Sequence, residues 1–357
     1  MKYKPYDYQE FATGFIVKNE VAATLLDCGL GKTVITLTAI KKLIDLGEIK
    51  KVLAWKAGEF FYDNAPAAFE SEASCSEIIY NEFCPANLSK YLMASSKAGV
   101  KTAVFLKPCD TYGVNQLIKD NRVNREMVYA VGTPCSGMVD AKKIKAAGYK
   151  TLLKVEVNGD KIIVTTPKGQ AELAKKDFLY NKCLMCKGND YMICDEELAE
   201  KLPVPEFTGD RFAEVKAIEA MSSAEKFAFW QEELSKCIRC NACRDICPAC
   251  NCEQCIFDNP EAPVAGKAYA DSVEEQMFHI IRAFHVAGRC VGCGECARVC
   301  PQGVKLGLLN MKFMKDINSF FGKFQAGADA ETRAPQVTFK EEDPEPNAAV
   351  EGGNSNA

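Results

Sequence analysis

The chain has 357 residues, of which 48% are apolar, so it has room for about two or three domains with buried cores. Its formal net charge of −4 argues against a broad nucleic-acid-binding surface. With 19 cysteines and only 2 histidines, it cannot hold His-rich metal sites and has little scope for Ser–His or Cys–His catalysis.

The start of the chain lacks the apolar core of a secretory signal, and no window comes near the roughly 18 apolar residues of a membrane span. We therefore expect a cytoplasmic protein with no membrane span and no nucleic-acid partner. Structural disulfides are rare in that compartment, so the many cysteines indicate bound metal. Their positions agree, because 14 of the 19 lie between Cys183 and Cys300.

Two N-terminal segments, PYDYQE at 5–10 and DCGLGKT at 27–33, resemble the start of a Swi/Snf-type helicase. The resemblance implies a nucleotide-binding loop in which Lys32 holds phosphates and Thr33 helps bind Mg²⁺. Nothing downstream supplies the acidic Mg²⁺-binding motif, the arginine finger or a second lobe. We therefore interpret residues 1–50 as a helicase-like remnant or gene fusion, and an ATP-dependent nucleic-acid enzyme as the least supported function.

Residues 51–180 alternate strand-like with helix-like patterns, which is typical of α/β layers. Buried strands are expected at 52–55, 102–106 and 127–131, and helices near 84–97 and 112–121. A β-hairpin is predicted over 151–166, with its turn at 158–160.

The C-terminal half has a different character. Residues 181–260 are rich in cysteine and in loop formers. An amphipathic helix is predicted over 271–287, ending at Gly288, and we expect its two histidines, His279 and His285, to have surface or core roles rather than metal-binding ones. From about residue 326 the chain has almost no core formers, so the tail is expected to be disordered.

Two cysteine runs repeat one spacing, with three cysteines three residues apart and a fourth just before a proline. This is the bacterial ferredoxin pattern, in which the first three thiolates surround one [4Fe-4S] cluster and the fourth reaches the other cluster. The pattern assigns one cluster to Cys237, Cys240, Cys243 and Cys300, and the second to Cys290, Cys293, Cys296 and Cys247. Zinc and a set of disulfides are the alternatives, but zinc sites use separate cysteine pairs and often histidine.

Five further cysteines are candidates for a third metal site: Cys183, Cys186, Cys250, Cys252 and Cys255. Closely spaced cysteines from two distant segments are what a third [4Fe-4S] cluster or a zinc site needs. We predict a third [4Fe-4S] cluster, with zinc and plain buried thiols as alternatives. The spacing does not choose four ligands from the five. Cys194 is expected to be a core residue.

Between about residues 53 and 325 the chain carries several recognisable stretches, YNEFC at 80–84, ANL at 86–88, LKPCDT at 106–111, VGTPCSG at 131–137 and KCLMCKG at 182–188. They resemble the beta-subunit family of coenzyme F420 hydrogenase and dehydrogenase. The run FHVAGRC at 284–290 resembles heterodisulfide-reductase-type ferredoxin subunits. The resemblance implies a domain that binds FAD and exchanges electrons with iron–sulfur clusters.

The loops that carry the resemblance follow strand-like segments, where α/β sheets place ligand sites. Their polar side chains are candidates for contacts with the phosphates or ring of FAD: Asn81, Asn87, Lys107, Asp110, Thr111, Asn115, Thr133, Lys182 and Lys187. Cys109 and Cys135 are expected to pack or to approach the flavin closely. There is no GxGxxG fingerprint, so a Rossmann nucleotide site is not indicated.

The predicted fold class is α+β, with an α/β flavin-binding domain over 51–230 and a helical two-[4Fe-4S] ferredoxin-like domain over 231–325, followed by a disordered tail over 326–357. The implied function is that of an electron-transfer subunit in an anaerobic oxidoreductase complex. Electrons would pass between a hydride carrier (a deazaflavin or a nicotinamide), FAD and the clusters. The expected partners are heterodisulfide-reductase, hydrogenase or formate-dehydrogenase subunits. A flavin-free, polyferredoxin-like electron wire is the alternative.

Overall fold

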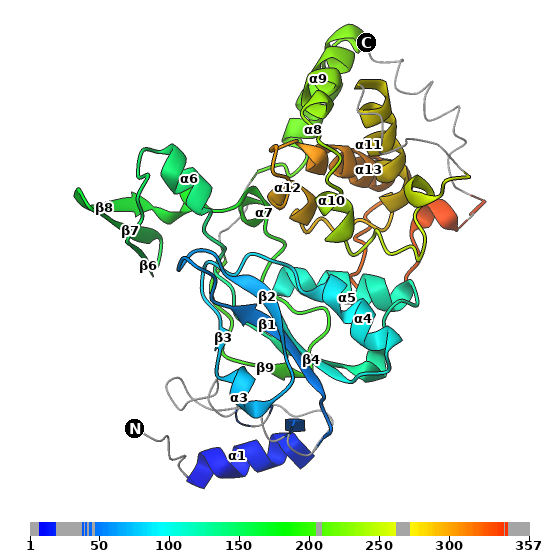
Figure 1. The fold of residues 1–357 in the computed structure, drawn as a ribbon. Coiled ribbons are helices and arrows are strands. Elements are labelled where there is room, and N and C mark those ends of the chain that lie inside the picture. The colour runs from blue at the N-terminus through cyan, green and yellow to red at the C-terminus, as the bar shows by residue number, and fades with distance from the viewer. Residues whose placement is uncertain are drawn as a thin grey trace. The chain divides into compact units, whose positions relative to one another are not determined.

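The computed structural model describes residues 7–18, 38, 40, 43–44, 47–204, 209–261, 272–338 and 340–341. The chain divides into two compact units, Met1–Phe207 and Thr208–Ala357, and each is described by itself (Figure 1). Of the helicase-like start, the structure describes the helix α1 (Asp7–Lys18). The Gly-rich segment 27–33 lies outside the described residues, so the interpretation of this segment stays a prediction.

The first unit is built on a mixed six-stranded sheet. Its strands are β1 (Lys51–Lys56), β2 (Ala65–Phe69), β3 (Ile78–Ile79), β4 (Thr102–Leu106), β5 (Val128–Gly132) and β9 (Glu196–Glu197). Strands β1, β4, β5 and β9 run parallel in that order, and β2 and β3 pair antiparallel with β1. All residues of β4 and β5 are buried, as continuous apolar runs in a parallel sheet should be. The three strands predicted in this region are confirmed.

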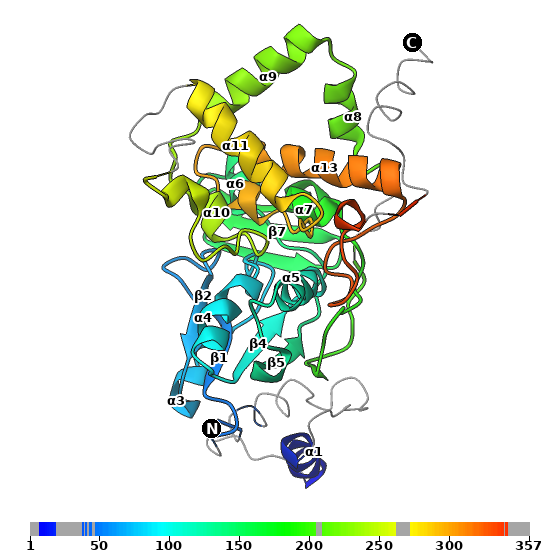
Figure 2. The same cartoon turned by 90° about the vertical axis from the view of Figure 1, so that its right-hand side faces the viewer.

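Helices of the first unit cover the sheet beside these strands. α4 (Leu92–Lys97) and α5 (Pro108–Lys119) both pack against β4 (Figure 2). α5 begins with a proline, whose fixed φ suits the first helical position. The helix expected near 84–97 is shorter than predicted, because only the 3₁₀ turn Ser89–Tyr91 and α4 are helical. The shorter helical segments of this unit are α3 (Glu72–Cys75), α6 (Ala141–Ala146), α7 (Asn181–Leu184), and the 3₁₀ turns Arg125–Met127 and Lys175–Phe178.

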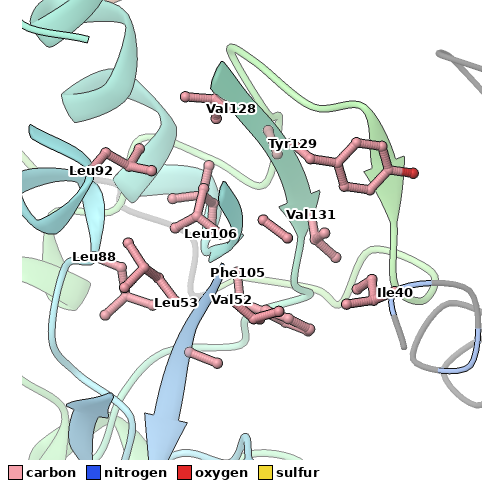
Figure 3. Close-up of a cluster of buried hydrophobic side chains, with 14 of the residues drawn as sticks. Ile40, Val52, Leu53, Leu88, Leu92, Phe105, Leu106, Val128, Tyr129 and Val131 are labelled. Carbon is pink, nitrogen blue, oxygen red and sulfur yellow. The ribbon is translucent and has the colours of Figure 1, made fainter. Parts of the chain in front are cut away.

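The core of the first unit lies between the parallel strands and the segment that precedes α4. Side chains of β1, β4 and β5 meet Leu88 and Leu92 in one buried cluster (Figure 3). Trp55 and Phe105 are among its largest fully buried members. This packing holds the carboxyl ends of β4 and β5, where the candidate flavin loops begin, in fixed positions.

A second, three-stranded sheet belongs to the same unit. It consists of β6 (Lys154–Asn158), β7 (Lys161–Thr166) and β8 (Gly169–Ala174), antiparallel throughout. The hairpin predicted over 151–166 is confirmed as β6 and β7. Strand β8 was not predicted, because none of its residues is fully buried and its side chains alternate between partly buried and exposed.

The described part of the second unit is helical. Its longer helices are α8 (Ala213–Glu219), α9 (Ser223–Ser235), α11 (Ser272–Val286) and α13 (Leu306–Phe321), and its short ones are α10 (Ala242–Asp245), α12 (Glu295–Arg298) and the 3₁₀ turns Ile256–Asp258 and Pro335–Val337. α11 packs against α9 and α13. The predicted amphipathic helix is confirmed as α11, and Gly288 follows it in the left-handed conformation, at φ 69°. The predicted order of an α/β part followed by a helical part is also confirmed.

Two predicted boundaries differ from the structure. The division falls at Phe207/Thr208 rather than at 230/231, because Val215 and Ile218 of α8 share a buried cluster with Leu308 of α13. The tail is not structureless from residue 326, since Ala326 is buried and the Gln325 amide donates to the carbonyl oxygen of Val291 at 3.3 Å. Residues 342–357 lie outside the described residues. Among the described residues, none of the helices combines the length and apolar character that crossing a membrane needs.

Candidate metal centres

The two cysteine runs of the second unit share one backbone conformation. Arg239 and Asn241 lie in the left-handed region, with φ 52° and 62°, between the cysteines of the first run. Gly292 and Gly294 occupy the matching places of the second run, each with φ 68°. Asn241 and Gly294 then begin α10 and α12. The repeated spacing therefore corresponds to a repeated loop that winds its cysteines around a common centre.

The first loop receives its fourth cysteine from the second run. Cys237, Cys240, Cys243 and Cys300 all line one cavity of the second unit. The backbone N–H of Arg239 donates to the Cys237 sulfur at 3.3 Å, and that of Val304 donates to the Cys300 sulfur at 3.4 Å. Amide donors of this kind stabilise thiolates and tune iron–sulfur clusters.

The second loop receives its fourth cysteine from the first run. Cys247 packs with Cys290 in an apolar cluster, and the charges of both act on Cys293 and on Cys296. Burial raises the pKa of the Cys296 thiol to about 12. The pKa of Cys247 is lowered to about 5, first by its hydrogen bond with Cys250. These contacts agree with the crossed ligation that the spacing predicts, and the assignment of ligands to each cluster stays a prediction.

The donor set fits two iron–sulfur clusters. Each group consists of four cysteine sulfurs, most of them buried or half-buried and enclosed by apolar residues. Metal binding displaces the thiol protons, and the positive charge of the metal offsets the raised pKa values by deprotonating the thiols that coordinate it. Four sulfurs without histidine, in two interlocked groups, match [4Fe-4S] ligation.

One face of α11 turns three buried polar side chains toward the cysteines: Glu275, His279 and Arg282, spaced four and three residues apart. The Cys237 sulfur, a Glu275 carboxylate oxygen and a His279 ring nitrogen lie within 4.8 Å of one another. Glu275 also pairs with Arg239 at 3.6 Å. Polar residues on the buried face of an amphipathic helix are unusual, and this was the one sign in the sequence that could have identified them.

His279 is buried beside the cavity of the first loop. Its side chain is 2% exposed and lines the cavity of the first loop. Among the described residues, neither ring nitrogen has a hydrogen-bond partner. Burial, with Arg282 and Arg239 nearby, lowers its pKa to about 3, so the ring is neutral. The two histidines were expected to lie in the core or on the surface. His279 is in the core and His285 is on the surface, but His279 also faces the cysteines.

Arg282 places a buried positive charge between the two groups. Its guanidinium donates to the Cys243 carbonyl oxygen at 3.0 Å. Burial acts to lower its pKa, but the charges of cysteines from both groups raise it above the ordinary value. On the other side, Asn310 of α13 donates to the Cys296 sulfur at 3.7 Å. The two groups thus share one cation but have different polar neighbours.

The five cysteines predicted for a third site belong to both units. Cys250 lies beside Cys247, Cys252 is exposed, and Cys255 packs with Phe257 and Phe278. These three belong to the second unit, and Cys183 and Cys186 belong to the first. The proposed pairing of the two sets therefore stays a prediction.

The first unit holds a group of thiols of its own. Burial is the main cause that raises the pKa values of Cys109, Cys135 and Cys183. Smaller contributions come from Cys135 to Cys109, from Cys183 to Cys135 and from Cys186 to Cys183, so these thiols are near one another. The N–H of Gly137 donates to the Cys135 sulfur at 3.4 Å, and the N–H of Met138 donates to the Cys183 sulfur at 3.3 Å. Burial raises the pKa of Cys135 to about 11. Spacing alone did not reveal this group, because its members come from three separate segments of the chain, two of which are helical.

Two of the candidate flavin residues, Lys107 and Thr133, directly follow β4 and β5, and three others lie on α5. Lys107 is fully buried, and its ammonium donates to the Ala86 carbonyl oxygen at 2.7 Å and pairs with Asp110 at 2.8 Å. It also lies over the ring of Trp55, 4.3 Å from the ring centre. The ammonium therefore holds the loop together from inside rather than facing an open site.

Two other candidates, both on α5, form hydrogen bonds with the backbone of Met192. Thr111 accepts a hydrogen bond from the Met192 N–H at 3.0 Å, and Asn115 donates to the Met192 carbonyl oxygen at 3.2 Å. Both side chains are buried on α5. In this structure they join distant parts of the first unit, and a flavin contact by either stays a prediction.

Four of the five remaining candidates have side-chain contacts within the first unit, and the fifth, Thr133, is buried. Asn81 accepts a hydrogen bond from Asn64, and Asn87 accepts one from Ser89. The Lys182 ammonium donates to the Pro85 carbonyl oxygen at 2.6 Å, and that of Lys187 lies 3.7 Å from the centre of the Tyr112 ring. Thr133 is fully buried just after β5. The structure therefore brings the family-like loops together at one edge of the sheet.

Comparison with known proteins defines the class first. Residues 233–304 match the family model described as a 4Fe-4S dicluster domain. That range contains all eight cysteines of the two loops. The second unit therefore carries a dicluster domain of the iron–sulfur class.

Curated relatives then cover most of the chain. It is 26% identical over 354 residues to the F420-dependent formate dehydrogenase subunit beta of Methanocaldococcus jannaschii, a match that covers 83% of this chain and 91% of that protein. It is 24% identical over 326 residues to the F420-dependent formate dehydrogenase 1 subunit beta of Methanococcus maripaludis, covering 73% and 81%. The resemblance to beta subunits of this kind is confirmed.

Two shorter or weaker matches complete the comparison. Ferredoxin-3 of Rhodobacter capsulatus is 33% identical over 67 residues, which are 18% of this chain and 66% of that protein. A chain in the structure of the F420-reducing [NiFe] hydrogenase complex from Methanosarcina barkeri matches 48% of this chain and 62% of its own length, at 15% identity. Its TM-score of 0.33 is too low to support an argument about shape.

Proposed function

We propose that this chain is the electron-transfer subunit of a formate-dehydrogenase-type complex, passing electrons between a deazaflavin and partner subunits. The observation that carries the proposal is the crossed pair of four-cysteine groups within the matched dicluster domain. Two relatives that each cover more than 70% of the chain are named as beta subunits of F420-dependent formate dehydrogenases. Heterodisulfide-reductase or hydrogenase subunits are the other partners that the family resemblance implies.

FAD in the first unit is the proposed link between the hydride carrier and the clusters. A bound flavin supplies the exchange between two-electron and one-electron chemistry that such a subunit needs. The support is the meeting of the family-like loops at the carboxyl ends of β4 and β5, the edge at which α/β sheets bind ligands. The residues there would bind and orient the flavin, with Lys187 and Lys182 nearest the cysteine pair in the sequence.

The third cluster is proposed to lie in the first unit. Cys109, Cys135, Cys183 and Cys186 lie near enough to affect one another's pKa in pairs, and the sulfurs of Cys135 and Cys183 accept backbone N–H bonds. This set is proposed beside the predicted combination of Cys183 and Cys186 with Cys250, Cys252 and Cys255, and it differs in taking all four sulfurs from the first unit. A cluster there would share the first unit with the proposed flavin.

The test is anaerobic purification of the full chain, followed by iron, sulfide and flavin analysis. About twelve irons, at four per cluster, with one FAD support the whole proposal. About eight irons without flavin support the electron wire instead. A chain that takes up zinc but no iron contradicts the proposal outright. Copurification with the catalytic subunit of a formate dehydrogenase tests the partner.

A matched pair of variants tests the third cluster. Cys135→Ser is expected to lower the iron content by about four per chain, because it removes one ligand of the proposed group. Cys252→Ser, at an exposed cysteine of the second unit, is the control and should leave the iron content unchanged. Iron loss in the control and not in Cys135→Ser would contradict the proposed ligand set.

A further inference from the structure

We infer that His279 is a positioning residue for the first iron–sulfur cluster, donating a ring N–H to a sulfur of that cluster and raising its reduction potential above what the four cysteines alone would set. The inference rests on the proposed function, because it requires the cluster bound by Cys237, Cys240, Cys243 and Cys300. It assigns to α11 a role in electron transfer that the cysteine pattern does not contain.

The geometry provides the donor and the place for its acceptor. His279 is 2% exposed, and it lines the same cavity as the four cysteines of the first group. A ring nitrogen lies within 4.8 Å of the Cys237 sulfur. Among the described residues neither ring nitrogen has a hydrogen-bond partner. A buried polar group without a partner is costly, so its occurrence beside this cavity indicates a partner that the protein chain does not supply.

The surroundings of His279 fix its orientation. Its ring meets that of Phe278 edge to face, with centroids 4.9 Å apart. Phe278 in turn lies under the guanidinium of Arg239, which pairs with Glu275 one helical turn before His279. These contacts connect α11 directly to the first cysteine loop. The ring is therefore held against the cavity and is not free to turn toward solvent.

The second group has a polar neighbour of its own, on a different helix. There, Asn310 of α13 donates its amide N–H to the Cys296 sulfur at 3.7 Å. In each group, then, a long helix brings one buried polar side chain to the cysteines. The donors differ in kind, an imidazole on one side and an amide on the other, so the two clusters should differ in potential.

The physical effect has a definite sign. Reduction adds negative charge to the cluster and its sulfurs, and a hydrogen-bond donor stabilises the more negative state. Removing the donor should therefore lower the reduction potential. A hydrogen bond to a charged group corresponds to at least about a tenfold change in the equilibrium between the two states, which is about 59 mV for a one-electron couple.

The first experiment measures both cluster potentials by EPR-monitored redox titration of the full chain. His279→Leu is expected to lower the potential of one cluster by about 59 mV or more, equivalent to about tenfold, and to leave the other unchanged. His279→Gln, which keeps an N–H donor, should retain most of the wild-type potential, and Asn310→Leu should shift the other cluster. Unchanged potentials in His279→Leu, or equal shifts of both clusters, would overturn the inference.

A second experiment does not depend on removing His279. The chain has only two histidines, and His285 is exposed, so His285→Gln leaves a single histidine that can be labelled with ¹⁵N. Pulsed EPR of the reduced protein should then show weak ¹⁵N coupling to one cluster. Two clusters with no coupling, or with coupling as strong as a direct iron–nitrogen bond, contradict this inference alone. A sample without clusters contradicts the proposed function and this inference with it.

Discussion

The two cysteine loops of the second unit have the same backbone but different side chains. Arg239 and Asn241 take the left-handed positions of the first loop, and Gly292 and Gly294 take those of the second. The Arg239 guanidinium packs on the ring of Phe278, 4.2 Å from its centre, whereas the second loop presents only backbone at the matching place. The first loop thus makes side-chain contacts with α11, whereas the glycines of the second loop adopt the left-handed conformation without strain.

The shape of each cysteine loop and the polar surroundings of its sulfurs therefore depend on different residues. Cysteine spacing and two left-handed residues set the shape of each loop. The polar residues that face the sulfurs come from α11 on one side and from α13 on the other, with Arg282 placed to act on both. Substitutions in the loops and in their neighbours can test whether loop shape and polar surroundings are independent.

The largest effect is expected from breaking the crossed ligation. Cys300→Ser should remove the same cluster as Cys237→Ser, because both cysteines line one cavity. Cys247→Ser should likewise match Cys290→Ser. Each variant is expected to lose iron from one cluster only, up to about four irons per chain, because it removes one of the four cysteine ligands of a [4Fe-4S] cluster. The measurement is iron content together with the EPR spectrum of the reduced protein.

The pairing of spectra makes this prediction specific. If Cys300→Ser gave the spectrum of Cys290→Ser, each run would hold its own cluster and the crossed arrangement would be wrong. The same result would undo the comparison between the loops, because the fourth ligand would no longer connect them.

A smaller effect is expected when the shared cation is removed. Arg282→Met keeps most of the side-chain volume but loses the hydrogen bond to the Cys243 carbonyl oxygen and the buried charge. We expect the free energy of unfolding to fall by about 1.5–3 kcal/mol, the range for hydrogen bonds to charged groups. Both cluster potentials should fall, because the charge acts on cysteines of both groups.

Thermal unfolding and EPR-monitored titration of the same sample check both parts. Lys315→Met is a control, since it also removes a cation paired with an acidic group in the second unit, but one that joins α13 to Glu219 of α8. A potential shift confined to one cluster in Arg282→Met would show that the cation belongs to one loop only.

The smallest effects concern the backbone of the loops. Gly292→Ala should lower the free energy of unfolding by about 1–2 kcal/mol, because an L side chain is strained at φ 68°. The new Cβ would also lie 3.3 Å from the Met314 methyl carbon, a tight contact. In the first loop, Asn241→Gly should change it by less than about 1 kcal/mol, because glycine accepts the same φ freely. Chemical denaturation measures both.

Equal destabilisation by Gly292→Ala and Asn241→Gly would contradict the view that the two loops share a strained conformation. It would mean that the Asn241 side chain contributes contacts comparable to the strain it carries. The comparison would then rest on side chains alone.

Much of the fold follows from local sequence, but several site residues do not. Continuous apolar runs predicted β1, β4 and β5, and helical periodicity predicted α11, because each pattern reflects burial of one element. Lys107 was predicted at a flavin site, yet its ammonium is buried against Ala86 and Asp110. A lysine before a helix has the same sequence signature whether it turns inward or outward, so only packing decides between the two.

The grouping of α8 with the second unit shows the same limit. Nothing in the composition of residues 213–219 separates them from the preceding loop-rich stretch, and they join α13 because Val215 and Ile218 meet Leu308. Likewise, Cys135 and Cys183 are 48 residues apart in the sequence and come near one another only when the first unit folds. Long-range neighbours of this kind depend on tertiary contacts that no short window contains.

Local sequence alone thus established the two cysteine runs, their shared spacing and the order of an α/β part followed by a helical one, and it predicts the crossed assignment of their cysteines. These features follow from short-range spacing, since three cysteines three residues apart and a proline after the fourth leave few ways to arrange a loop around a metal centre. Only the tertiary structure decided which polar groups face the cysteines. His279, Arg282 and Asn310 reach them because α11 and α13 pack against the loops, and the direction of a buried side chain is set by its neighbours in space.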